Sequence, residues 1–153
     1  MASYDTNLAA EYYVLSCLHR LGIAAALTLG NKKGVDIMVA RTAGDAVTVE
    51  VKGVAGKYDW PASNIQSSNP DRHFVALVCF EGQINNPEMP KPRVWVIPYG
   101  ELEPFMRYYK GRTNVSRAAI KNEGACFEDK WHLIEGTNEQ DAPSSLKTET
   151  FAT

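Results

Sequence analysis

The feature that most constrains the fold is FVALVCF, an unbroken run of seven apolar residues at positions 74–80. Turn-forming and polar residues bound the run on both sides. A short apolar run without polar alternation is typical of a strand that is covered on both faces. The run therefore predicts a central strand with a layer of structure on each side of its sheet.

The segments around this strand predict the rest of the fold. Amphipathic spacing predicts a helix over 7–22, which Asn7 or Thr6 would cap and Gly22 would end. Further patterns predict strands at 23–30, 35–40, 47–52 and 94–99, a short helix after Pro61, a helix at 101–110 and a short helix at the end of 111–136. This order of elements predicts an α/β fold, a three-layer sandwich around a mixed central sheet.

Length and composition fit one domain. The chain has 153 residues, of which 44% are hydrophobic and 22% are charged, as in ordinary globular proteins. We expect a single domain over 1–136 and a polar, mobile tail over 137–153. No apolar run reaches the length of about 18 residues that a membrane span needs, so we expect no membrane partner.

The cysteine and charge content limit the cellular compartment and the binding partners that we expect for the protein. Cys17, Cys79 and Cys126 are scattered and form no CxxC pair, so we expect buried thiols in the cytoplasm. The formal net charge of −2 argues against a strongly basic, nonspecific nucleic-acid binder. Any nucleic-acid surface would then be a local patch. The oligomeric state is open, with a homodimer among the expectations.

Three charged residues interrupt two apolar strands of the expected sheet. Side chains alternate between the two faces of a strand, so Asp36 lies opposite the Val and Ile face of the first strand, and Glu50 and Lys52 lie opposite the Val face of the second. A three-residue connection at 42–44 would place Asp36 directly across from Glu50. Two carboxylates about 5 Å apart repel by roughly 3 kcal/mol at an effective dielectric of about 20, and something must offset that repulsion.

A shared proton, Lys52 or a cation could offset it. Glu11 falls within the apolar arc expected for the first helix, and a carboxylate there needs a partner; the arc consists of Leu8, Tyr12, Val14, Leu15 and Leu18. Three carboxylates and one ammonium leave a formal charge of −2, which suits Mg²⁺ or Mn²⁺. Such an ion could activate a water and stabilise charge on a phosphate, with Lys52 orienting that water. The alternative is an exposed ion pair of little energetic weight.

The order of these residues resembles the motif of the PD-(D/E)XK nuclease superfamily, as it stands in Holliday-junction resolvases and restriction-endonuclease-like proteins. Asp36 is followed by thirteen intervening residues and then by Glu50-Val51-Lys52, and Val35 replaces the motif's proline. The resemblance covers about residues 7–99. It implies a restriction-endonuclease-like αβββαβ core and magnesium-dependent cleavage of phosphodiester bonds.

The resemblance also implies roles for individual residues. Asp36 and Glu50 would be metal ligands, with the Val51 carbonyl as a further ligand. Lys52 would be the catalytic lysine. Glu11 would be an auxiliary acidic residue of the catalytic site, in contact with the metal or the water.

Residues outside the motif are open to two interpretations. Lys32 and Lys33, in the loop before Asp36, could touch a phosphate backbone or merely solubilise the loop. Lys57 could neutralise a phosphate beside an aromatic that stacks on a base, although a Trp before a Pro, as at Trp60, more often anchors a loop. A basic series could be a DNA-facing patch or an ordinary solvated surface: Arg107, Lys110, Arg112, Arg117 and Lys121. Structural or surface roles are expected for His19, His73 and His132.

The sequence thus predicts a magnesium- or manganese-dependent nuclease that acts on nucleic acid, with DNA as the expected substrate. A second hypothesis is a catalytically inactive module of the same fold that binds nucleic acid or a protein partner. A third is a structural role in a larger assembly. Metal binding that is lost in Asp36→Asn would favour the enzyme over the other two.

Overall fold

A mixed sheet of five strands forms the centre of the computed structural model, which describes residues 5–28, 34–67 and 69–136. The strand order is β1-β2-β3-β5-β6. Strands β3 and β5 are parallel, and the other neighbours are antiparallel. The strands are β1 Ala24–Leu27, β2 Ile37–Ala40, β3 Ala46–Val54, β5 His73–Cys79 and β6 Arg93–Pro98. The predicted mixed central sheet is therefore confirmed.

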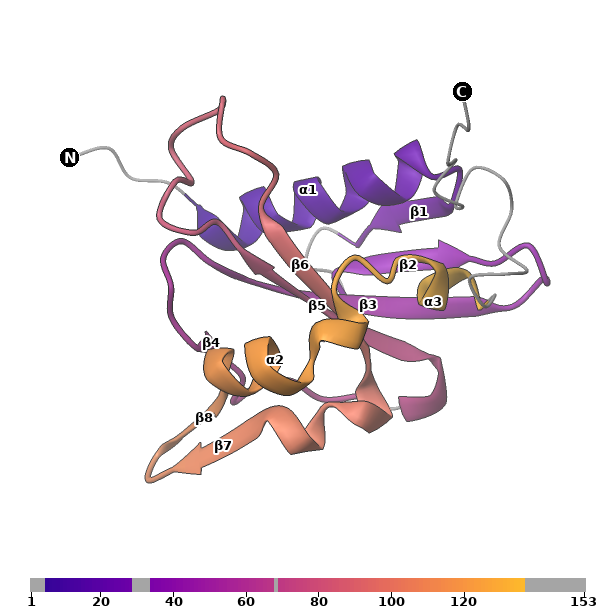
Figure 1. Ribbon diagram of the computed structural model, residues 1–153. Coiled ribbons are helices and arrows are strands. Elements are labelled where there is room, and N and C mark those ends of the chain that lie inside the picture. The colour runs from indigo at the N-terminus through magenta and orange to yellow at the C-terminus, as the bar shows by residue number, and fades with distance from the viewer. Residues whose placement is uncertain (1–4, 29–33, 68, 137–153) are drawn as a thin grey trace.

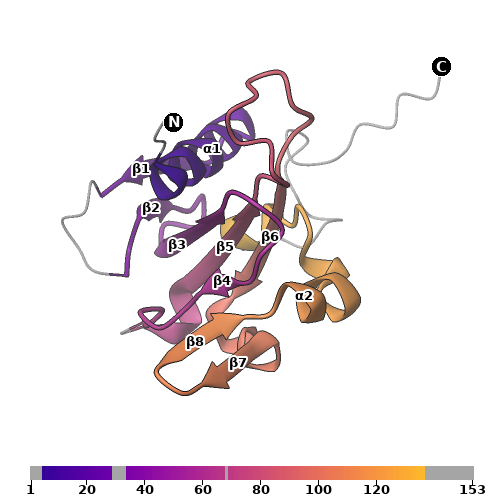
Figure 2. The same ribbon diagram turned by 90° about the vertical axis from the view of Figure 1, so that its left-hand side faces the viewer.

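Different structure covers each face of this sheet. Helix α1 lies across one face, and a small second sheet and α2 lie on the other (Figures 1 and 2). The second sheet has the order β4-β8-β7. The elements outside the central sheet are α1 Thr6–Arg20, β4 Trp60–Pro61, β7 Met106–Tyr109, β8 Arg112–Val115, α2 Arg117–Glu123 and α3 His132–Glu135, with 3-10 helices at Pro70–Arg72, Tyr99–Glu101, Glu103–Phe105 and Ala125–Phe127.

Strand β5 separates two hydrophobic cores. Every residue of β5 is buried, as the apolar run predicted. Phe74, Ala76 and Val78 belong to the core beneath α1. Val75 and Leu77 belong to the core beneath the second sheet and α2. Covering both faces in this way removes a whole strand of apolar surface from water.

Helix α1 differs in detail from its prediction. Asp5 caps its start, since the Asp5 side chain accepts a hydrogen bond from the Leu8 backbone N–H at 2.9 Å. The buried side chains of α1 are Ala10, Val14 and Leu18, whereas Leu8 and Tyr12 are exposed. The sequence analysis therefore centred the buried face of this helix on the wrong residues.

A close contact explains the shift. A Cβ on Gly53 of β3 would lie 2.7 Å from the Ala10 Cβ, so the helix approaches the sheet at a pair of very small residues. Larger side chains such as Leu8 do not fit into this contact and lie at the rim instead.

Two predicted helices are wrong. Turns and the 3-10 helix Pro70–Arg72 occupy the described part of 62–72, where a short helix was expected after Pro61. The αβββαβ order therefore lacks its second helix in these residues. The segment 101–110 forms two 3-10 helices and β7, because Pro104 starts a short turn and the Tyr pair that follows favours a strand. Helix α2 and strand β8 were not expected.

Other sequence predictions have mixed outcomes. The indole N–H of Trp60 donates to the Val78 carbonyl at 3.0 Å, so this Trp anchors its loop to the core.

All three cysteines are free of disulfide bonds, but Cys126 is exposed and Cys17 only partly buried, against the expectation of buried thiols. No helix within the described residues is both long and apolar enough to cross a membrane. The tail 137–153 lies outside the described residues.

Candidate active site

The β2–β3 hairpin has the predicted register. Ile37 pairs with Val49 and Ala40 pairs with Ala46. Gly44 takes a φ of +97° in the connection, a conformation that glycine adopts without strain. The antiparallel pairs end at Ile37 and Val49, so Asp36 lies just before the first paired residue of β2 and Glu50 just after its partner in β3.

The Asp36 carboxylate extends the hydrogen bonding of the sheet where β2 begins. Its Oδ2 accepts a hydrogen bond from the Val51 backbone N–H at 2.7 Å, and the Asp36 N–H donates to the Val49 carbonyl at 3.0 Å. The N–H and C=O of one strand residue point to the same side. The Val51 carbonyl is therefore directed toward the same edge of β3 as Asp36.

Glu50 is a buried carboxylate with one oxygen that lacks a hydrogen-bond donor. The residue is only 3% exposed. Its Oε2 lies 3.2 Å from the ammonium of Lys52. Its Oε1 has no hydrogen-bond partner among the described residues. Since an unpaired buried carboxylate oxygen is unfavourable, the second oxygen is a place for a ligand with positive charge.

Two further polar side chains adjoin Glu50 and Lys52. The Lys52 ammonium donates to Asn64 Oδ1 at 2.9 Å. His73 Nε2 lies 3.5 Å from Glu50 Oε1 without hydrogen-bond geometry, and His73 Nδ1 lies 2.7 Å from the Thr48 hydroxyl. Sequence reasoning gave Asn64 no role and His73 only a structural or surface role. The shared parity of His73, Val75 and Leu77 along β5 could have indicated that His73 lies on the face of Glu50.

Glu11 reaches this group from α1. Burial raises the pKa of Glu11 most, and a hydrogen bond to Asp36 and repulsion by its charge raise it further, to about 7. The expected partner of this helix carboxylate is therefore Asp36. Since burial is the largest cause, the raised pKa reflects mainly the low polarity around Glu11, with the Asp36 charge as a further contribution.

The chemistry of this group fits a hard divalent cation. Among the described residues, no group of three or more His, Cys, Asp or Glu side chains is placed so that it could hold a metal ion, so Glu11, Asp36 and Glu50 do not form a three-carboxylate site. Mg²⁺ does not need such a group, because it keeps several waters and binds through one or two carboxylates. The Glu50 Oε1 without a hydrogen bond and the contact between the Glu11 and Asp36 carboxyl groups are compatible with such a site.

The three lysines expected to contact nucleic acid near the site are not found together with the Glu50 group among the described residues. Lys32 and Lys33 lie outside the described residues. Lys57 is exposed in the loop after β3, and among the described contacts it does not join the group around Glu50. Gly34 takes a φ of +75°, and a Cβ there would lie 3.1 Å from the Gln66 carbonyl and 3.9 Å from Glu50 Oε1. The loop before β2 therefore runs close to Glu50.

The basic series in the C-terminal half does not form one patch. Arg107, Lys110 and Arg112 are exposed on the β7–β8 hairpin. Arg117 instead lies 3.3 Å from Glu81 in an ion pair. Lys121 is exposed on α2, which follows β8 along the chain.

Comparison of the chain with family models, curated proteins and solved structures finds no match. The resemblance to the PD-(D/E)XK superfamily therefore stays a prediction. A function has to be argued from the side chains of the site.

Proposed function

We propose that the protein is a metal-dependent nuclease that hydrolyses phosphodiester bonds of DNA. The observation that supports this most is the position of Glu50: a carboxylate 3% exposed, with one oxygen 3.2 Å from the Lys52 ammonium and the other without a hydrogen bond, 3.5 Å from His73 Nε2. A buried acid with an open oxygen beside a cationic donor is unfavourable for stability alone. Such arrangements are characteristic of functional sites.

Asp36, Glu50 and the Val51 carbonyl would hold the ion. Bound Mg²⁺ or Mn²⁺ would supply activation of a water and neutralisation of charge on the phosphate. Asp36 is fixed for this task by the hydrogen bond that its Oδ2 accepts from the Val51 N–H. Glu50 is fixed by Lys52.

Lys52 would act directly on the reacting atoms. An ammonium has three N–H donors. Glu50 and Asn64 lie within reach of two of them, at 3.2 and 2.9 Å. The third can donate to the attacking water or to a phosphate oxygen as its charge grows. Glu11, with a pKa raised to about 7, can exchange a proton with Asp36 or with a water beside it.

The free cysteines and the absence of disulfides among them fit a reducing compartment. We therefore place this activity in the cytoplasm.

The test uses isosteric variants, because Asp36→Ala would also remove the acceptor of the Val51 N–H. We expect Asp36→Asn and Glu50→Gln each to reduce Mg²⁺-dependent cleavage of labelled DNA by about 100-fold or more, since both remove negative charge that binds the ion. Calorimetry with Mn²⁺ alone should show binding to the parent and none to Asp36→Asn.

Asp71→Asn is the matched control, because Asp71 is exposed in the 3-10 helix after the crossover loop. It should cleave and bind Mn²⁺ like the parent. Circular dichroism should show the same fold for all variants. Cleavage by Asp36→Asn and Glu50→Gln at the parental rate would contradict the catalytic assignment of these residues, whereas a parent that does not cleave DNA with Mg²⁺ would favour an inactive binding module.

A further inference from the structure

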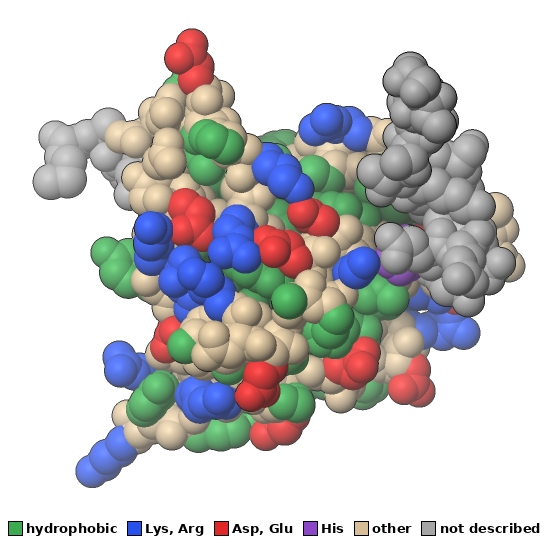
Figure 3. All heavy atoms as spheres, viewed as in Figure 1, with side chains coloured by type: hydrophobic (Ala, Val, Ile, Leu, Met, Phe, Trp, Pro, Cys, Tyr) green, Lys and Arg blue, Asp and Glu red, His purple; other side chains and the backbone are tan. Residues whose placement is uncertain are grey.

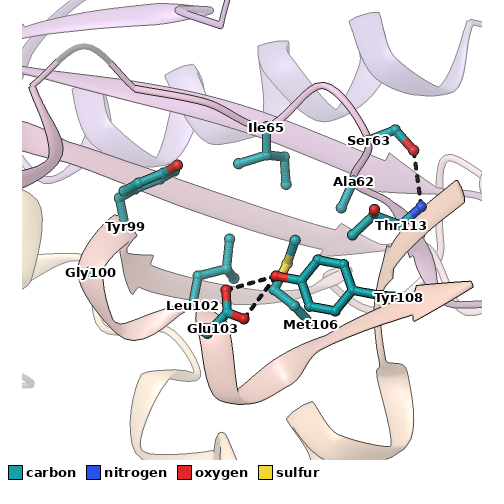
Figure 4. Close-up of a pocket in the computed structure, with 10 residues that line it drawn as sticks. All are labelled: Ala62, Ser63, Ile65, Tyr99, Gly100, Leu102, Glu103, Met106, Tyr108 and Thr113. Carbon is teal, nitrogen blue, oxygen red and sulfur yellow. Dashed lines mark hydrogen bonds between the residues drawn. The ribbon is translucent and has the colours of Figure 1, made fainter.

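A pocket of about 430 Å³ lies beside the candidate active site, between the crossover loop after β4 and the β7–β8 hairpin (Figure 4). Its volume lies in the range of small-ligand pockets, about 300–1,000 Å³. Its walls combine aliphatic and aromatic side chains with a few polar groups: Ala62, Ser63, Ile65, Tyr99, Gly100, Leu102, Glu103, Met106, Tyr108 and Thr113.

The pocket is joined to the candidate active site at two points. Ser63 and Ile65 line it on either side of Asn64, whose Oδ1 accepts the hydrogen bond from Lys52. Tyr99 lines it as well, and the Tyr99 ring lies 5.7 Å from the His73 ring, which in turn faces Glu50. A group in the pocket would therefore sit next to a phosphate held by Lys52.

The polar and aromatic groups of the pocket suit a planar, nitrogen-rich ring. Tyr99 and Tyr108 enter from opposite sides with their rings directed inward (Figure 4). Both oxygens of the exposed Glu103 carboxylate lie 2.8 Å from the Tyr108 hydroxyl. A carboxylate has about four acceptor positions, so Glu103 can still accept from an amino group.

We propose that this pocket takes one unpaired base of a DNA strand, next to the phosphate that is cleaved. The proposal rests on the proposed nuclease function and adds that the substrate has an unpaired nucleotide at the site. Aromatic side chains stack on bases, and bases taken out of the helix are read by hydrogen bonds to their pairing edge. Glu103 favours a base that presents an amino group, such as cytosine, over thymine, which presents a carbonyl at that position.

The β7–β8 hairpin supplies the positive charge that a strand in this position needs. Arg107, Lys110 and Arg112 are exposed on it, and the Arg112 guanidinium lies 5.1 Å from the Tyr109 ring centre. In the space-filling view, Lys and Arg side chains gather toward the end of this hairpin, at lower left (Figure 3). The backbone of a strand whose base enters the pocket would pass along these side chains.

The test measures binding without cleavage, in EDTA, by fluorescence anisotropy. The probes are labelled oligodeoxycytidine and oligothymidine of about ten nucleotides and a fully paired duplex. We expect the parent to bind oligodeoxycytidine about fivefold or more tighter than oligothymidine. Glu103→Ala should abolish this preference. Glu101→Ala removes the same charge outside the pocket and should retain the preference.

A second variant fills the pocket. Gly100 lines it, and a Cβ added there would meet no atom within 4 Å, so the fold leaves room for a side chain at this position and Gly100→Leu is designed to narrow the pocket. We expect this variant to bind single strands about tenfold more weakly and the duplex like the parent. Asn122→Leu, which adds an exposed leucine on α2, is the matched control and should bind all three probes like the parent.

The outcomes separate this inference from the nuclease proposal. Equal affinity of the parent for the two single strands, or no effect of Gly100→Leu on them, would overturn the pocket assignment even where Asp36→Asn has lost cleavage. Conversely, a cytosine preference that depends on Glu103, together with a parent that does not cleave DNA, would support the pocket and overturn the nuclease assignment.

Discussion

The Lys52 ammonium lies between an anion and a neutral amide. Glu50 Oε2 holds it from one side at 3.2 Å and Asn64 Oδ1 from the other at 2.9 Å. Since the Lys52 side chain is only 16% exposed, few waters compete for it. Glu50 stabilises the charge of the ammonium, and Asn64 adds a second point that fixes its direction. Asn64 is therefore a positioning residue in the proposed reaction.

This arrangement predicts different effects on cleavage kinetics when Lys52 or Asn64 is replaced. Lys52→Ala should lower kcat by about 100-fold or more, because a donor to the reacting atoms is lost. Asn64→Ala should lower kcat by about tenfold or less with KM nearly unchanged, because the ammonium remains but is held less well. Steady-state cleavage kinetics would measure both. Gln66→Ala removes a neighbouring exposed amide and is the control; an equal loss in this variant would contradict the role of Asn64.

At this scale the sequence predicts part of the site. Asp36, Glu50 and Lys52 could be placed on one surface because side-chain alternation along a strand is a local property. The partners of Glu50 and Lys52 were not predictable in the same way. Asn64 and His73 reach the site only through the crossover from β3 to β5, and no local pattern specifies where such a loop lies.

At the scale of elements, the contact between α1 and β3 holds Glu11 near Asp36. The approach is close because Gly53 has no side chain: an added Cβ would lie 2.7 Å from the Ala10 Cβ and 3.1 Å from the Thr6 carbonyl oxygen. Helix and strand cannot both keep their positions with a larger residue here.

Gly53→Ala should therefore lower the free energy of unfolding by about 1–3 kcal/mol. Chemical denaturation would measure the change. Gly100→Ala is the matched control, since its Cβ would meet open space, and it should change stability by less than about 0.5 kcal/mol. A Gly53→Ala protein as stable as the parent would contradict the close contact.

Elements with a long, regular pattern were the predictable ones. β5 was recognised from its apolar run and α1 from its amphipathic spacing. The sequence analysis predicted a helix at 101–110 because the apolar spacing of this segment is compatible with one. The turn that pairs β7 with β8 lies just beyond the segment, at Gly111, which has a φ of +80°. The two residues of β4 are too few for any periodicity, so the second sheet could not be foreseen.

At the scale of the whole molecule, the last described segment binds back to the central sheet. Arg93 of β6 makes two hydrogen bonds to the Glu128 carboxylate, at 2.8 and 3.0 Å. At the opposite end, the Arg41 side chain donates to the Ile134 carbonyl and the Thr42 N–H donates to the buried Glu135 carboxylate, both at 2.8 Å. The segment thus joins β6 to the β2–β3 connection.

The contact between Arg93 and Glu128 predicts a pH dependence of global stability. The Arg93 guanidinium lowers the pKa of Glu128 below its ordinary value of 4.5, chiefly through its hydrogen bonds. A carboxylate whose pKa is lower in the folded state stabilises the fold above the pKa of the unfolded state, and this contribution is lost as the pH falls through the folded pKa. Both side chains are about one-third exposed, so the contribution is below about 1 kcal/mol.

Glu128→Gln should therefore be less stable than the parent at neutral pH, and the difference should shrink as the pH is lowered below about 4.5. Urea denaturation at a series of pH values would measure it. Glu88→Gln, at an exposed position in the loop before β6, should match the parent throughout. A difference that is constant with pH would contradict the electrostatic origin.

The hydrogen bond from the Val51 N–H to the Asp36 carboxylate has an evolutionary consequence. If the proposed nuclease activity were lost in a descendant, the Val51 N–H would still need an acceptor there, so the architecture alone would preserve an aspartate or an asparagine at position 36. Among the described residues, no backbone group depends on the Glu50 side chain for a hydrogen bond. Its buried oxygen without a hydrogen bond lowers the stability of the fold. In any lineage of this protein, a glutamate kept at position 50 would then indicate retained catalytic activity far better than an aspartate kept at position 36.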